Sequence, residues 1–347
     1  MKRSPDILFM ITDSCNCKCS FCSRNNLSLK KEEPKAADVE AALNKLSEEY
    51  SQSKLIITGG EPSLSGHFLE YVEYAMSLFR KVEIQSNATF STSIGARLKY
   101  LINQNLYIQF SLDGTREYHD MIRGKGVFDC VLDNLRFFSD EYEHISLSMT
   151  ITRDNRESAL SLAKVLNNYR FRRLSVSIVQ PINPLTEILL TKDEWNEFVD
   201  NLLPLCYYRV DVSKLYDFEM MDTFLQSGRD WNGYTNCGRG VSHFYISPQF
   251  EVLPCTCINE SVGNLLIDEL HELKERLESA SKIKVSESSP CCKCRYLSIC
   301  NGGCPGLSTK VFGAPNMGDI RCPIIRQYLK NERRANIAKN VNSSAKE

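Results

Sequence analysis

The chain has 347 residues, of which 42% are hydrophobic and 24% are charged, and its formal net charge is −1 at pH 7. This length allows one large α/β domain and a smaller second one. The near-neutral charge provides no field for nucleic acid or an anionic membrane, and no apolar run reaches the roughly 20 residues of a membrane-spanning helix. Residues 1–6 show no signal-peptide core. We therefore expect a cytoplasmic protein that binds neither nucleic acid nor membrane.

Six short β-branched apolar runs alternate with amphipathic helical stretches along the first half of the chain. Such alternation predicts parallel βαβ units, in either a TIM-like barrel or a doubly wound sheet. In both architectures the functional loops follow the carboxyl ends of the strands. The predicted strands are residues 7–12, 55–58, 82–85, 107–112, 145–151 and 174–179.

The loop after the first predicted strand carries an unusual group of cysteines. Cys15, Cys19 and Cys22 follow that strand in the spacing C-x3-C-x2-C, and Phe21 precedes the last of them. Three thiolates on one loop suit a 4Fe–4S cluster that leaves one iron open to an external ligand. A structural zinc site usually needs two CxxC-like pairs and four closed positions, which this loop lacks.

This loop resembles the cluster-binding motif of radical S-adenosylmethionine (SAM) enzymes, which has an aromatic residue at the position of Phe21. The resemblance implies an α/β fold with a six-stranded partial (β/α)6 barrel, and SAM bound at the open iron. It also implies that SAM splits into methionine and a 5′-deoxyadenosyl radical, which removes a hydrogen atom from the substrate. An electron donor such as flavodoxin or ferredoxin would start the reaction.

Two further motifs follow the second and third predicted strands. Gly59, Gly60, Glu61 and Pro62 resemble the GGE motif of this family, which meets the amino group of SAM. A glycine-rich turn that ends at proline is the alternative interpretation. Asn87 lies in a segment similar to the family's TNG motif but without its glycine, so Asn87 could also simply accommodate a tight turn.

The fourth predicted strand leads into Ser111 and Asp113, and Arg123 follows in the run His-Asp-Met-Ile-Arg-Gly. This pairing resembles the radical SAM subgroup that carries a C-terminal SPASM domain. It implies that Ser111 and Asp113 lie near the ribose and methionine parts of SAM, with Arg123 as a charge partner. Taken singly, Asp-Gly is a common turn and an arginine after it is usually solvated.

A second group of cysteines matches the C-x2-C-x5-C-x3-C-gap-C signature of SPASM domains, which implies a small, loop-rich domain with two auxiliary 4Fe–4S clusters besides the SAM cluster. In the upstream half, Phe250 occupies a position where the family has glycine, which questions the turn geometry there. Zinc is the alternative metal for these thiols. By analogy, auxiliary cluster I would bind Cys237, Cys255 and Cys304, and auxiliary cluster II would bind Cys291, Cys294, Cys300 and Cys322.

The first auxiliary set lacks a fourth ligand. Cys257 is the nearest candidate, but thiols at positions i and i+2 reach one cluster only if the chain bends between them. The other interpretation is an open iron that touches substrate. The expected organisation is a barrel (1–185), a helical bridge (186–236), a SPASM domain (237–325) and a polar tail (326–347).

SPASM-type enzymes mostly modify peptides or proteins, so the resemblance favours a maturase of ribosomally made peptides that forms C–C, C–O or thioether cross-links. We expect no leader-binding domain before the barrel, so recognition of the peptide would need either a separate leader-binding protein or the barrel itself. A sulfatase-maturing role is disfavoured, because those enzymes have an acidic residue where this chain has Thr256.

Three other functions stay open. A small-molecule dehydrogenase or haem-side-chain enzyme would share every motif. An epimerase needs a thiol that returns a hydrogen atom, and Cys206 is the best placed of the unassigned thiols, which include Cys17 and Cys130. A free cysteine is more often a small buried hydrophobic residue. An iron–sulfur electron carrier would have no use for the GGE motif.

Overall fold

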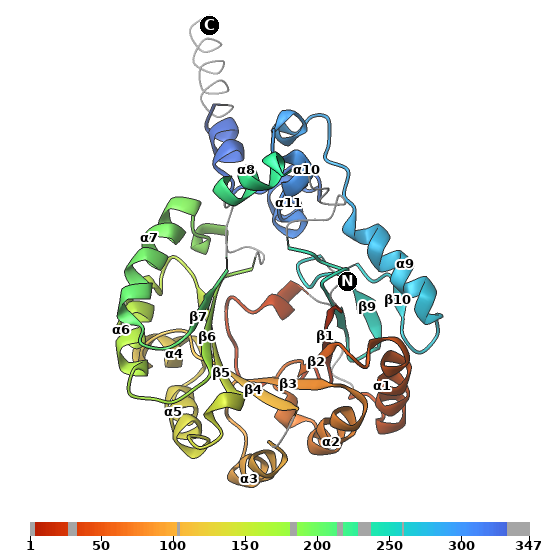
Figure 1. The fold of residues 1–347 in the computed structure, drawn as a ribbon, viewed down its shortest axis with the longest axis vertical. Coiled ribbons are helices and arrows are strands. Elements are labelled where there is room, and N and C mark those ends of the chain that lie inside the picture. Colours follow the sequence, from red (N-terminus) through yellow and green to blue (C-terminus); the bar gives the residue numbers. More distant parts are fainter. Residues whose placement is uncertain are drawn as a thin grey trace, which may run out of the picture.

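The computed structural model describes residues 4–26, 33–102, 105–180, 186–213, 218–227, 237–258 and 260–331. Its centre is a ten-stranded sheet in the order β10-β9-β8-β1-β2-β3-β4-β5-β6-β7. The strands β1 to β6 pair in parallel in chain order and curve into an arc with helices on its outer face (Figure 1). This arrangement is the predicted partial (β/α)6 barrel. The six strands are β1 Asp6–Met10, β2 Lys54–Thr58, β3 Lys81–Ser86, β4 Leu106–Ser111, β5 Ile145–Ile151 and β6 Arg173–Ile178.

The helices between these strands bury one apolar face each against the sheet. In α1, Val39, Leu43 and Leu46 are almost fully buried, as their helical spacing predicts. The start of α7 is fixed by a capping box between Thr191 and Glu194. The outer helices are α1 Ala36–Tyr50, α2 Phe68–Leu78, α3 Thr92–Leu101, α4 Arg116–Arg123, α5 Val127–Phe137, α6 Arg156–Leu166 and α7 Lys192–Leu202. Short 3-10 helices cover Ser23–Asn26, Pro62–Leu64, Tyr142–His144, Thr186–Ile188, Leu203–Leu205 and Pro290–Lys293.

Four short strands extend the sheet at its two edges. The strand β7 (Val210–Val212) pairs in parallel with β6, and β8 (His243–Ile246) pairs in parallel with β1. Antiparallel pairing then adds β9 (Glu251–Leu253) and β10 (Gly263–Asn264). The segment expected to be a helical bridge therefore also supplies a strand. The first part of the expected SPASM segment shares the barrel's own sheet, while the domain boundaries themselves stay predictions.

The turn between β8 and β9 contains the phenylalanine that stands at the family's glycine position. Phe250 adopts a left-handed backbone with φ of 64°, and its N–H donates to the carbonyl of Ser247 at 2.8 Å. Its side chain is 6% exposed and packs near the ring of Phe9 in β1, with 6.4 Å between ring centroids. The chain thus forms a glycine-type turn without glycine, and the buried ring offsets part of the backbone strain.

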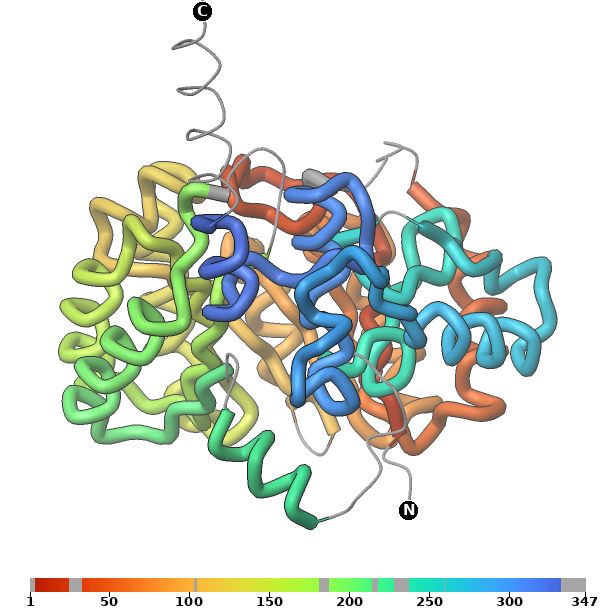
Figure 2. The backbone as a smooth tube through the Cα atoms, turned by 90° about the horizontal axis from the view of Figure 1, so that it is seen from above, coloured from red at the N-terminus to blue at the C-terminus, as the bar shows by residue number. Residues whose placement is uncertain are grey.

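The C-terminal segment lies across the open side of the arc (Figures 1 and 2). A small apolar group joins it to the cysteine loop, because Phe21, Val179, Leu189 and Leu307 form one buried cluster. Within the described residues, no helix is both long and apolar enough to cross a membrane. The helices of this half are α8 Phe218–Gln226, α9 Leu270–Ser281, α10 Leu297–Cys300 and α11 Pro305–Phe312, with a final helical stretch at 323–331.

Replacing Phe110, which is fully buried in β4 and lies between Phe90 and Phe138, tests how much this core contributes. We expect Phe110→Ala to lower the free energy of unfolding by about 3–5 kcal/mol, because the cavity left behind cannot close fully. Tyr207→Ala is the control, since Tyr207 is 89% exposed, and should change it by less than about 0.5 kcal/mol. Urea unfolding measures both, and similar midpoints for the two variants would contradict the prediction.

Candidate active site

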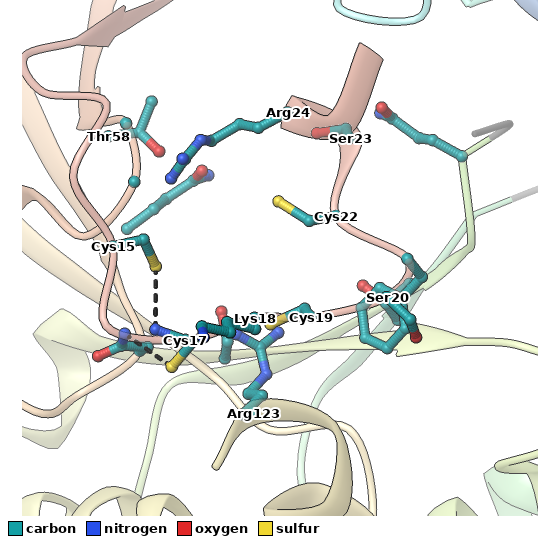
Figure 3. Close-up of a pocket in the computed structure, with 18 of the residues that line it drawn as sticks. Cys15, Cys17, Lys18, Cys19, Ser20, Cys22, Ser23, Arg24, Thr58 and Arg123 are labelled. Atoms are coloured by element: carbon teal, nitrogen blue, oxygen red, sulfur yellow. Dashed lines mark hydrogen bonds between the residues drawn. The ribbon is translucent and has the colours of Figure 1, made fainter. Parts of the chain in front are cut away.

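A cavity of about 560 Å³ lies at the carboxyl ends of the barrel strands. In Figure 3, the sulfur atoms of Cys15, Cys19 and Cys22 point toward a common space, with Arg24 on one side and Arg123 on another. No carboxylate lines the cavity among the described residues, and the cysteines are the side chains there that suit iron. The lining residues are Cys15, Cys17, Lys18, Cys19, Ser20, Phe21, Cys22, Ser23, Arg24, Thr58, Gly59, Gly60, Gln85, Ser86, Asn87, Ser111, Arg123, Thr150, Ser177, Ile178 and Gln180.

The fourth thiol of the loop, Cys17, interacts with its neighbours. Its N–H donates to Cys15 Sγ at 3.4 Å, and Asn87 Nδ2 donates to Cys17 Sγ at 3.1 Å. Interaction with the Cys17 thiol lowers the pKa of Cys15 to about 6 and the pKa of Cys19 to about 7. Burial raises the pKa of Cys22. Two of the three predicted ligands therefore favour the thiolate form, which is the form that binds metal.

The two glycines after β2 let a turn pack directly on the cysteine loop. A side chain at Gly59 would place its Cβ 2.3 Å from the carbonyl oxygen of Thr12, and one at Gly60 would come within 1.9 Å of the carbonyl oxygen of Ser14. The backbone N–H groups of Gly60 and Glu61 donate to those same two oxygens, each at 2.8 Å. Only glycine allows this approach, which fixes the loop relative to β2.

Glu61 is fully buried behind the cavity rather than in its lining. Its carboxylate accepts from the Ser63 hydroxyl at 2.7 Å, the Ser86 hydroxyl at 2.9 Å and the Asn87 N–H at 2.7 Å. Burial raises the pKa of Glu61, and these hydrogen bonds oppose that shift. The carboxylate thus ties the end of β3 to the glycine turn. Pro62 is also buried outside the lining, so a contact of either residue with SAM stays a prediction.

Asp113 is likewise buried behind the cavity and orients a residue that reaches it. Its Oδ2 accepts from Arg123 Nε at 2.7 Å, and its Oδ1 accepts from the Thr150 N–H at 2.9 Å. Arg123 and Ser111 line the cavity, as does Asn87. Because the Asp113 side chain is 1% exposed, the ion pair holds the guanidinium in a fixed direction toward the cysteine loop.

Arg24 and Gln180 are among the cavity residues to which the sequence analysis assigned no role. Arg24 donates from Nη2 to the carbonyl of Asp13 at 2.7 Å and reaches into the cavity (Figure 3). Gln180, just after β6, accepts from Thr256 Oγ1 at 3.3 Å and from Cys257 Sγ at 3.5 Å. A polar residue directly after a predicted strand is the one signal that could have identified Gln180. It connects the first cavity with the second group of cysteines.

Three predicted ligands of auxiliary cluster I, Cys255, Cys257 and Cys304, lie together. The N–H of Cys257 donates to Cys255 Sγ at 3.2 Å, and the Cys257 thiol interacts with the thiols of both Cys255 and Cys304. The chain bends in a turn after β9, which meets the condition for Cys255 and Cys257 to face one site. Cys237 is exposed. Burial raises the pKa of Tyr245, and the negative charge of the Cys255, Cys257 and Cys237 thiolates near it raises that pKa further.

The predicted ligands of auxiliary cluster II line a separate small cavity beside α8 and α10. Cys291, Cys294, Cys300 and Cys322 all line it. Burial raises the pKa of Cys291 to about 11 and that of Cys300 to about 12. Cys292, which has no predicted role, is not in this lining and donates to the carbonyl of Glu287 at 3.3 Å. The four thiols that the sequence assigned to one cluster therefore surround one space.

Residues 9–166 match the Radical SAM superfamily model. This part of the chain is a radical SAM domain. Enzymes that carry this domain bind a 4Fe–4S cluster and SAM.

Two curated relatives align with most of this chain. The AdoMet-dependent heme synthase of Oleidesulfovibrio alaskensis is 23% identical over 334 residues, which is 89% of this chain and 84% of the relative. The antilisterial bacteriocin subtilosin biosynthesis protein AlbA of Bacillus subtilis is 24% identical over 325 residues, which is 89% of this chain and 69% of the relative.

Among solved structures, Streptococcus suis SuiB bound to the precursor peptide SuiA matches with a TM-score of 0.74 at 17% identity. The match covers 94% of this chain and 76% of SuiB. At this identity the likeness establishes the fold, which is that of the radical SAM enzymes.

Cys206, the predicted hydrogen donor, lies away from the cavity of the radical SAM domain. Its thiol donates to the carbonyl of Leu202 and to the Tyr208 hydroxyl, each at 3.4 Å, at the outer end of α7. It is absent from the lining, and burial raises its pKa. The structure therefore does not bring Cys206 to the place where a radical would form.

His119, which sequence reasoning gave no role, is fully buried beside the Asp113–Arg123 pair. Its Nδ1 accepts from the Asp113 N–H at 3.2 Å, while its Nε2 is buried and has no hydrogen-bond partner in the described part of the chain. Burial lowers the pKa of His119 to about 4. The ring therefore stays neutral at neutral pH, as its accepting Nδ1 requires.

The His119 shift predicts acid sensitivity of the fold. The unfolded chain protonates this histidine near pH 6.5 and the folded chain only near pH 4, so stability falls as the pH drops between these values, by about 3 kcal/mol in all. His119→Gln removes the titrating group and should flatten this part of the pH profile. Urea midpoints of the cluster-free wild type and variant at pH 7 and pH 5 measure the effect, and parallel losses would contradict it.

Proposed function

We propose that this protein is a radical SAM peptide maturase that forms a side-chain cross-link in a ribosomally made peptide. The C–C, C–O or thioether bond would follow removal of a substrate hydrogen atom by the 5′-deoxyadenosyl radical. The observation that supports it best is the cavity in which Cys15, Cys19 and Cys22 meet the glycine turn after β2. A 4Fe–4S cluster held there would supply one electron to SAM.

The chain's own residues would bind and orient SAM around these thiols. The backbone at Gly59 and Gly60 lines the cavity and offers polar groups close to the cysteine loop. Ser111 and Arg123 would bind the ribose and methionine parts, while Phe21 forms an apolar wall. Asn87 would act from the end of β3. Glu61 and Asp113 would position these groups from behind, because their carboxylates are fully engaged with other residues of the chain.

The remaining cysteine groups would hold two auxiliary 4Fe–4S clusters, which makes three clusters in total. The contact of Cys257 with both Cys255 and Cys304 supports Cys257 as the missing ligand of auxiliary cluster I, beside Cys237. Cys291, Cys294, Cys300 and Cys322 surround one cavity and would hold auxiliary cluster II. Gln180 links the radical cavity to the first of these sets, which supports auxiliary cluster I as the one nearer to a bound substrate.

A peptide substrate is supported by the relatives of this chain. AlbA takes part in subtilosin bacteriocin biosynthesis, and SuiB has been solved with its precursor peptide. The enzyme would work in the cytoplasm, receive electrons from a flavodoxin or ferredoxin, and recruit its peptide with a separate leader-binding protein. The small-molecule alternative keeps support from the heme synthase relative. For an epimerase, Cys17 is the unassigned thiol that lines the cavity.

SAM cleavage tests the enzyme class. The reconstituted protein with dithionite should convert SAM to 5′-deoxyadenosine and methionine, and the variant with Cys15, Cys19 and Cys22 changed to Ala should not, because it cannot hold the SAM cluster. Cys130→Ala is the matched control, since Cys130 lies on α5 outside the cavity, and should retain the activity. If the intact protein forms no 5′-deoxyadenosine, the assignment of this site as a SAM-cleaving centre is refuted.

Mass spectrometry with a short peptide encoded beside the gene tests the reaction. A cross-link forms when the peptide loses two hydrogen atoms, so we expect a mass lower by two hydrogens and no solvent deuterium in the product. Solvent deuterium with an unchanged hydrogen count would support epimerisation instead. Cleavage of SAM without any change in peptides, but with a change in a porphyrin substrate, would favour the small-molecule function.

Iron content tests the auxiliary clusters. We expect about twelve irons per reconstituted chain, and the loss of about four when Cys291, Cys294, Cys300 and Cys322 are changed to Ala. Changing Cys292 to Ala is the control within the same loop, and it should leave the iron content unaltered because its thiol points away from the cavity. Zinc bound in place of iron by anaerobically purified protein would contradict the assignment.

A further inference from the structure

A second cleft lies beside the proposed active site, between the segment that leads into α7 and the C-terminal end of the described chain. It has a volume of about 270 Å³. In Figure 2 the final helical stretch, in dark blue, lies beside the light-green chain that leads into α7, and both segments contribute to the lining of the cleft. Its lining consists of Arg153, Leu189, Leu190, Thr191, Ile320, Arg321, Arg326, Leu329 and Lys330.

The charges in this cleft are unbalanced. Arg153 is neutralised by Glu194, with its Nε 3.2 Å from Oε1, and Arg321 is neutralised by Asp319 at 2.7 Å. Arg326 and Lys330 have no ion-pair partner within the described part of the chain, and no carboxylate lines the cleft there. They are four residues apart in the helical stretch 323–331, so both lie on the same face of it. Among the described residues, the cleft therefore presents two positive charges without a compensating carboxylate.

The walls between these charges are aliphatic. Leu189 and Leu190 are 4% and 1% exposed. Ile320 is partly buried against the cluster that contains Leu189, and Leu329 is partly buried against a separate cluster that contains Ile325. A ligand that fits this lining carries carboxylates next to apolar side chains. The chain as a whole has a net charge of −1 and so lacks the field that attracts nucleic acid, which favours a peptide over a polyphosphate.

The cleft and the cavity share a wall. Phe21, which lines the cavity, packs in one buried cluster with Leu189, which lines the cleft, and Ile320 packs against the same cluster. A peptide segment in the cleft would thus lie across this shared wall from the cavity that the cysteine loop lines. From this juxtaposition we propose that the cleft docks an acidic, aliphatic segment of the substrate peptide, which rests on the peptide substrate of the proposed function.

Docking here would hold the peptide by a part that does not react. Carboxylates of the peptide would pair with Arg326 and Lys330, and its aliphatic side chains would pack on Leu189 and Ile320. The neighbouring residues of the peptide could then enter the cavity past the Phe21 wall. Such anchoring raises the effective concentration of the reacting residues at the site.

The test uses the full reconstituted chain and a fluorescein-labelled peptide that alternates Leu and Glu, followed by fluorescence anisotropy at low salt. We expect it to bind, and matched Leu-Gln and Leu-Lys peptides to bind much more weakly. The double variant Arg326→Glu, Lys330→Glu should weaken binding by about tenfold or more, because attraction becomes repulsion. The milder Arg326→Gln and Lys330→Gln changes should each weaken it less, which keeps the test valid if the double variant unfolds.

A double control variant, Arg80→Glu with Lys164→Glu, makes the same charge change elsewhere. Arg80, in the turn before β3, and Lys164, on α6, are exposed residues outside the cleft, so this variant should leave the affinity within about twofold. Equal weakening by this control, or unchanged binding by the Arg326→Glu, Lys330→Glu variant, would overturn the proposal. A preference for single-stranded RNA or for phosphatidylserine vesicles over the acidic peptide in competition would overturn it as well.

The outcome separates this proposal from the proposed function. An intact protein that forms 5′-deoxyadenosine and modifies a peptide, but does not bind the acidic probe, overturns the docking cleft alone. A protein that binds the probe through Arg326 and Lys330 but forms no 5′-deoxyadenosine overturns the proposed function and leaves the docking result standing.

Discussion

The backbone contact between the turn after β2 and the loop after β1 is the constraint on which the site depends. Gly60 and Glu61 donate to Thr12 and Ser14, and neither glycine of the turn tolerates a Cβ. These bonds hold the loop that carries the three predicted ligand thiols against the sheet. Glu61 extends the same constraint to β3, because it accepts the N–H of Asn87. A flexible loop would lose conformational entropy each time cofactors bind. This loop loses much of that entropy when the chain folds.

Two buried carboxylates support the cavity from outside its lining. Glu61 and Asp113 are fully buried, and neither lines the cavity, yet each fixes a group that does. The lining itself keeps cationic, neutral polar and thiol groups, which suits a negatively charged metal centre and the carboxylate of SAM. Placing the acids behind the lining supports the geometry while keeping their repulsion away from thiolates.

Sequence patterns predicted the parts of this structure that local chemistry determines. The strands β1 to β6 are apolar runs with helices between them, and the cysteine motif around Cys15 gained support from the motifs that follow the later strands. The strands β7 to β10 escaped prediction because they have two to four residues and depend on pairing with distant partners. The contact between Gln180 and Cys257 and the placement of Cys206 also follow from the tertiary fold, which no local pattern encodes.

The left-handed turn at Phe250 has a consequence for how the two halves of the molecule move. A glycine there would make the same turn but leave β1 without the ring that packs near Phe9. With phenylalanine, the segment that carries Cys255 and Cys257 shares its hydrophobic core with the strand that leads to Cys15. Separating the cysteine-rich half from the barrel would expose that core to water, so the spacing between the two groups of thiols is set by core packing rather than by a hinge.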